Sequence, residues 1–206
     1  MSRRYGAAAL TVAAVLFVLY PAVRPWHDES TLDGARASMS SGAWVAAHAF
    51  GMIGFVLVPV GLLALRDLLG SPLATAALVS TWVGAGLVLP YYGAEDFALH
   101  AIASRHPEQL LDLVDAIRFG GTQATFFGVG LVLLGVGAVL AAVAIWRSRV
   151  LPRSCGILFA VGYALYLPQF FTPAPVRIAH GVLLGAGLVW LAAALWTARA
   201  QPREAL

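Results

Sequence analysis

The residue types best suited to chemistry gather in residues 90–100, which read PYYGAEDFALH. If the chain stays helical here, Asp96 and His100 are four residues apart and share a face, where an acid and an imidazole can pair. Glu95 then projects about 100° away around the helix. A carboxylic acid in apolar surroundings can keep its proton and pass it to a substrate, with histidine as its partner. We therefore interpret Glu95, Asp96 and His100 as candidate catalytic residues.

Two further histidines, His48 and His180, lie one to two turns inside long apolar segments and at similar depth. Ionisable side chains in such segments are candidates for function, because a charge at mid-helix costs roughly 2.5–3.5 kcal/mol. Arg177 precedes His180 by about one turn, and Tyr92 precedes the two acids. We interpret His48, His180, Arg177 and Tyr92 as ligand-binding candidates. A histidine that packs in the bundle and donates to a backbone carbonyl is the alternative for each imidazole.

Imidazole and carboxylate groups also bind transition metals, and His48, His100 and His180 would be the ligands here. The sequence has no HExxH motif and no regularly spaced histidine cluster. Haem needs only two facing histidines, for which His48 and His180 would serve. No cofactor is required by any motif. The single cysteine, Cys155, excludes an intrachain disulfide and a cysteine-based zinc site.

The elements that position these residues are predicted to be membrane helices. The chain has 206 residues, of which 60% are hydrophobic and 11% charged, whereas soluble domains carry roughly 25% charged residues. A soluble fold of this size cannot bury that much apolar surface, but a lipid bilayer solvates it. The basic residues are all arginines, scattered between apolar runs without a basic stripe, so nucleic acid is not an expected partner. The expected partner is the lipid bilayer.

Six apolar segments are long enough, or nearly so, to cross a hydrocarbon core of roughly 30 Å at about 1.5 Å per residue. The predicted fold is therefore all-α, a bundle of about six transmembrane helices in a single domain, 1–206. The predicted spans are 6–23, 42–65, 73–93, 122–147, 154–171 and 175–198.

A short amphipathic helix is predicted over residues 107–119, lying at the membrane surface. Pro107 suits a first helical position, and Gly120 follows the end. One face is apolar and the other acidic, as in helices that lie in an interface; a plain connector is the alternative. The apolar face comprises Leu110, Leu111, Val114 and Ile117, and the acidic face Glu108, Asp112 and Asp115.

Arginine placement predicts the orientation, because cytoplasmic loops are enriched in basic residues. With both termini in the cytoplasm, eight arginines lie on the cytoplasmic side, namely Arg3, Arg4, Arg66, Arg147, Arg149, Arg153, Arg199 and Arg203. Five lie on the other side, namely Arg24, Arg36, Arg105, Arg118 and Arg177. We expect a multi-pass protein of the cell membrane with all its histidines on or near the outer side.

The motifs that define common enzyme classes are absent: there is no P-loop, no GxGxxG after a strand and no GxSxG. Pro59 is the only helix breaker in a central zone, which argues against a transporter with broken helices at the midplane.

The main hypothesis is an outward-facing polar site that binds an apolar or amphipathic small molecule, or converts it by acid/base chemistry. A non-catalytic component that packs against a partner protein, or a haem- or metal-binding protein, is the alternative. The oligomeric state stays open.

Overall fold

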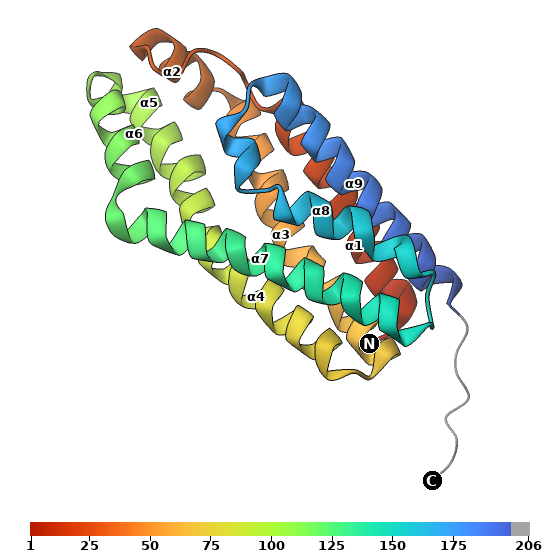
Figure 1. The fold of residues 1–206 in the computed structure, drawn as a ribbon. Helices are drawn as coiled ribbons and strands as arrows, with labels where there is room; N and C mark the ends of the chain where they lie inside the picture. The colour runs from red at the N-terminus through yellow and green to blue at the C-terminus, as the bar shows by residue number, and fades with distance from the viewer. Residues whose placement is uncertain (199–206) are drawn as a thin grey trace.

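The computed structural model describes residues 1–198, which form helices and no strand (Figure 1). Five helical segments are long and apolar enough to cross a bilayer, so the predicted all-α transmembrane bundle is confirmed. They are α1 (Arg3–Val23), α3 (Gly42–Leu69), α4 (Pro72–Gly93) with its continuation to Arg105, α7 (Gly121–Ser148) and α9 (Ala174–Thr197).

The predicted span 154–171 is not one continuous helix. It comprises a 3₁₀ turn (η3, Arg153–Gly156), the short helix α8 (Ile157–Ala164) and a second 3₁₀ turn (η4, Pro168–Phe171). Pro168 has no amide hydrogen to donate to the carbonyl of Ala164, which is where α8 ends. This broken segment nevertheless leads from the end of α7 to the start of α9 and packs against both helices (Figure 1).

The long helices pack closely where small residues meet. Gly84 of α4 faces Gly130 of α7, so that any side chain at either position would meet the backbone of the other helix. Gly181 of α9 lies against Phe17 and Pro21 of α1. Small residues at such contacts let membrane helices approach closely, which maximises van der Waals contact.

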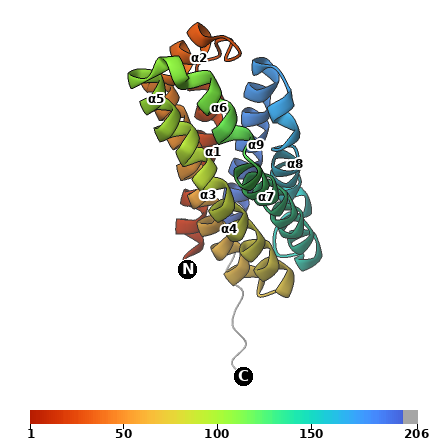
Figure 2. The ribbon, with the colours of Figure 1, turned by 90° about the vertical axis from the view of Figure 1, so that its left-hand side faces the viewer.

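One end of the bundle carries a cap, made of α2 (Leu32–Met39), α5 (Leu99–Arg105) and α6 (Leu110–Phe119), with the short turn η2 (Pro107–Gln109) before α6 (Figure 2). We call this the cap end. The cap has an apolar core of its own, to which Trp44 at the start of α3 contributes. The amphipathic helix predicted over 107–119 is confirmed, because Leu110 and Val114 are buried while Asp112 and Asp115 are exposed. The prediction of a single domain stays a prediction.

The ends of the described chain meet away from the cap (Figure 1). The amino group of Met1 pairs with Asp67 at 2.5 Å, and the guanidinium of Arg3 donates to the carbonyl of Ala198. Arg199 and Arg203, which were counted on the cytoplasmic side in predicting the orientation, lie outside the described residues.

Candidate functional site

The segment with the two predicted acids is a π-helical turn, η1 (Ala94–Ala98). It follows Pro90, which cannot donate to the carbonyl of Gly86, so that the helix is already loosened at this point. Glu95 is 6% exposed and Asp96 is fully buried. Single π-helical turns inside α-helices are frequent at functional sites. The turn therefore marks this part of the cap end as a candidate site on grounds independent of residue type.

Glu95 belongs to a buried ion network. Its carboxylate accepts hydrogen bonds from Nε and Nη2 of Arg118, at 2.5 and 2.9 Å. Arg118 also pairs with Glu29 at 2.9 Å, and Glu29 pairs with Arg24 at 2.6 Å. Burial alone would lower the pKa of the Arg118 guanidinium, but the two carboxylates outweigh burial and raise that pKa. The network connects the loop after α1 and the end of α6 to the π-helical turn. The two hydrogen bonds from the Arg118 guanidinium stabilise the Glu95 carboxylate as an anion.

Asp96 and His100 are not paired. Nδ1 of His100 donates to the carbonyl of Met39 at 2.8 Å, which ties α5 to α2. Neither carboxylate oxygen of Asp96 has a hydrogen-bond partner within residues 1–198. A buried carboxyl group without partners costs far less as a neutral acid than as an anion. Asp96 thus has the surroundings of a proton-holding acid, although without the predicted imidazole partner.

His48 starts a row of rings that crosses the bundle beneath the cap and is buried except at its other end, where His180 is partly buried. Its Nδ1 donates to the carbonyl of Trp44 at 2.9 Å, and its ring centre lies 5.9 Å from that of Tyr92. The hydroxyl groups of Tyr92 and Tyr166 are 3.2 Å apart. The ring of Tyr166 in turn packs edge-on against His180 at 5.3 Å. We call His48, Tyr92, Tyr166 and His180 the ring row.

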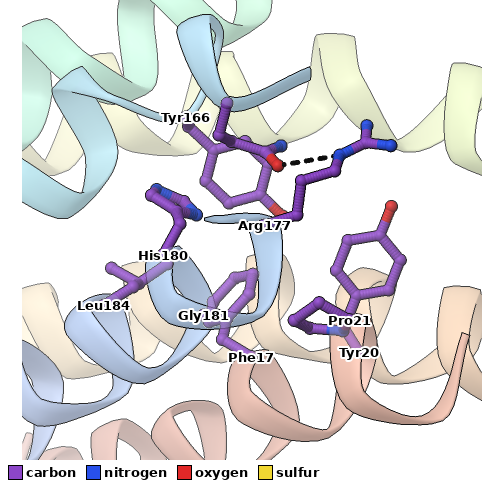
Figure 3. A pocket seen from close by; sticks show the side chains of 9 residues that line it. Phe17, Tyr20, Pro21, Tyr166, Arg177, His180, Gly181 and Leu184 are labelled. Atoms are coloured by element: carbon purple, nitrogen blue, oxygen red, sulfur yellow. Dashed lines mark hydrogen bonds between the residues drawn. The ribbon is translucent and has the colours of Figure 1, made fainter. Parts of the chain in front are cut away.

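The ring row ends at a small cavity between α1, α9 and the end of the broken segment (Figure 3). The volume of the cavity, measured as the space open to the centre of a water-sized sphere, is about 10 Å³. This is room for roughly one water molecule. Nε2 of His180 donates to the carbonyl of Gly162 at 2.7 Å. The polar side chains that line the cavity are Tyr20, Tyr166, Gln169, Arg177 and His180.

Arg177 is held at the rim of this cavity by neutral partners. Its Nε donates to the side-chain oxygen of Gln169 at 3.1 Å, as Figure 3 shows. Its guanidinium carbon lies 5.1 Å from the ring centre of Trp26 and 4.9 Å from that of Phe170. Arg24 contacts the same indole at 4.5 Å, but Arg24 has Glu29 as a partner. No carboxylate pairs with Arg177 in the described part of the chain.

The structure brings together four of the seven predicted site residues. His48, Tyr92 and His180 lie in the ring row, and Arg177 lies at the cavity next to it. Glu95 adjoins the row, because Trp44, which packs on His48, donates to the Glu95 carbonyl at 3.0 Å. Asp96 and His100 contribute to neither the row nor the cavity. The residues that sequence reasoning missed are Tyr20, Arg24, Glu29, Arg118, Tyr166 and Gln169.

The arrangement does not suit a haem between His48 and His180, because the rings of Tyr92 and Tyr166 lie between the two imidazoles. Both imidazoles also donate to backbone carbonyls. Within residues 1–198, no three His, Cys, Asp or Glu side chains gather as a metal-binding group.

The five long apolar helices make the chain a multi-pass integral membrane protein. Comparison of the chain with known protein families, with curated proteins and with solved structures gives no match. The residues at the cap end therefore provide the basis for a functional proposal.

Proposed function

We propose that the cap end holds a binding site for the polar head of an amphipathic small molecule that arrives from the lipid. The observation that carries this proposal is the convergence of five polar side chains on one cavity. The space admits only about one water-sized group, so a head-group atom fits while an alkyl chain stays in the bilayer. Polar side chains near helix ends reach the head-group region of a membrane, where such a head lies.

The ring row supports the proposal because it gives the cavity a rigid wall. Tyr92 and Tyr166 are each 2% exposed and hold each other through their hydroxyl groups. His180 is fixed by its bond to Gly162 and by the Tyr166 ring. Groups held in this way lose little conformational entropy when a ligand binds.

Photocrosslinking tests the proposal directly. The protein in lipid nanodiscs is exposed to dodecyl probes that carry a diazirine in the chain and a carboxylate, hydroxyl or trimethylammonium head. We expect saturable labelling of peptides from α1 and α9, which an excess of unlabelled probe suppresses and which His180→Ala weakens. The matched control is His106→Ala, an exposed histidine of the cap end. Labelling that is unsaturable and equal in both variants would contradict a specific site; a stable complex with another protein would then favour the partner-binding alternative.

A second candidate function is acid/base chemistry at the π-helical turn η1 rather than at the cavity, and the buried, unpartnered carboxyl of Asp96 favours it. Asp96→Asn keeps the shape of the side chain but removes the acid. Lipid extracts of membranes with wild-type protein should contain a product that extracts with Asp96→Asn lack. Identical extracts, with both proteins folded, would exclude this role of Asp96.

We further propose that the protein resides in the cell membrane with both termini in the cytoplasm and the cap end outside. The excess of arginines away from the cap supports this orientation. Single cysteines at Glu108, on the cap, and at Ser71, between α3 and α4, can be introduced into a Cys155→Ala background. A membrane-impermeant maleimide should label position 108 in intact cells and position 71 only after lysis; the reverse pattern would overturn the orientation.

A further inference from the structure

We infer that the head group bound at the cap end is anionic, a carboxylate or a phosphate, and that Arg177 binds it. This inference rests on the proposed function and adds the chemical class of the ligand. Its starting point is the difference between two arginines that share one indole, Arg24 and Arg177 on Trp26.

The charges around these arginines are unevenly matched. Arg24 and Arg118 are both paired with carboxylates, through Glu29 and Glu95. Arg177 is half-buried, yet its one side-chain hydrogen bond within residues 1–198 goes to the neutral amide of Gln169. Partly buried charges are normally paired, because desolvation is costly. An anion from outside the described chain would complete the pairing.

The guanidinium of Arg177 is arranged for such a ligand. Gln169 occupies Nε, while the two terminal nitrogens donate to no described residue. Trp26 and Phe170 hold the group in place through contacts with their rings. A fixed guanidinium presents parallel N–H groups that match the two oxygens of a carboxylate or phosphate.

The surroundings supply a further donor and select the form of the ligand. The hydroxyl of Tyr20 lies on the same side of the cavity as the Arg177 guanidinium (Figure 3). A tyrosine hydroxyl can donate a second hydrogen bond to an anion. Pro21, Leu184 and Phe17 line the rest of the cavity. Because the cavity has room for about one head-group atom, the other atoms of the head would lie at its rim, beside Arg177.

Binding measurements on the purified full-length protein test the inference. The probes are dodecanoate and dodecyl phosphate as anionic amphiphiles, dodecanol and dodecyltrimethylammonium as neutral and cationic ones, and acetate and inorganic phosphate as free anions. Each competes against the photoreactive carboxylate probe. The variants are Arg177→Gln, which removes the positive charge, and Arg177→Lys, which keeps the charge but lacks the planar guanidinium group. Arg36→Gln removes an exposed arginine of the cap end as the matched control.

We expect the anionic amphiphiles to compete best and Arg177→Gln to raise their Kd about tenfold or more, which is the effect of losing roughly 1.4 kcal/mol. Arg177→Lys should lie between wild type and Arg177→Gln, and Arg36→Gln should match wild type. Raised salt should weaken binding to wild type but not to Arg177→Gln, a readout that a general loss of folding would not produce.

The other outcomes separate the two proposals. Equal competition by dodecanol and dodecanoate would overturn the anionic head while leaving the binding site intact. Competition by acetate or phosphate as strong as that of the amphiphiles would support an anion site but overturn the amphiphile as its source. Binding of none of the probes would overturn both proposals.

Discussion

The hydroxyl groups of Tyr92 and Tyr166 lie 3.2 Å apart where both side chains are almost fully buried. This contact joins the end of α4 to the broken segment before α9, so it connects the two parts of the ring row. Neither tyrosine is near the other in the sequence, and the contact places His48 and His180 at opposite ends of one continuous set of rings.

Removal of one of these hydroxyl groups should destabilise the protein more than removal of both. Tyr92→Phe leaves the Tyr166 hydroxyl buried and unpaired, at a cost of about 1–3 kcal/mol. The double variant with Tyr166→Phe removes both polar groups and should recover much of that loss. The stability of Tyr92→Phe, of Tyr166→Phe and of the double variant is measured by unfolding the detergent-solubilised protein, with Tyr5→Phe, at a tyrosine that is 74% exposed, as the control. Additive losses would show that the two hydroxyl groups do not act as a pair.

Loss of the Glu95 carboxylate should loosen the cap. Glu95→Gln leaves Arg118 buried with only Glu29 as a charged partner, and breaking a buried ion pair costs roughly 3 kcal/mol. Hydrogen exchange should quicken in α6 and α2 and stay unchanged in α1. Glu108→Gln, at a side chain that is 64% exposed, should change stability by less than about 1 kcal/mol. Equal protection of the cap in both variants would refute a fastening role for the network.

An apolar side chain at position 96 should stabilise the fold. Asp96 is buried with both oxygens unpartnered in the described residues, so Asp96→Val removes an unfavourable burial of about 1–3 kcal/mol. Thermal unfolding should move to higher temperature, whereas Asp112→Val on the exposed face of α6 should have little effect. A lower unfolding temperature would mean that Asp96 has a stabilising partner in the membrane.

Pro168 should be needed for the cavity as well as for the break after α8. Pro168→Ala restores an amide that can donate to Ala164, so α8 can lengthen and turn Gln169 away from Arg177. We expect slower hydrogen exchange over residues 165–171 and weaker binding of the carboxylate probe. Pro175→Ala is the control, because Pro175 lies in the first turn of α9, where no amide donor is needed. Unchanged exchange over 165–171 would show that other contacts hold the break.

The placement of five of the six predicted spans followed from the sequence, because a run of apolar residues long enough for the bilayer is a local property. The sixth, 154–171, is apolar as well, but it is broken into short helical pieces. The amphipathic helix α6 was equally predictable, since Leu110 and Val114 repeat at helical spacing on one face. The same reasoning placed His48, Tyr92, Arg177 and His180 near one end of the bundle.

Tertiary structure alone decided which of those residues meet. Helical spacing suggested that Asp96 and His100 would pair, but the π-helical turn changes that spacing, and the carbonyl of Met39, on another helix, accepts from His100 instead. Arg118 reaches Glu95, and Tyr166 reaches Tyr92, across separations that no short-range pattern encodes. Gln169 lies in the 3₁₀ turn η4, beyond the break after α8, and from there its side-chain oxygen accepts from Arg177. Hydropathy is read along the chain, whereas the choice of partner depends on how the helices pack.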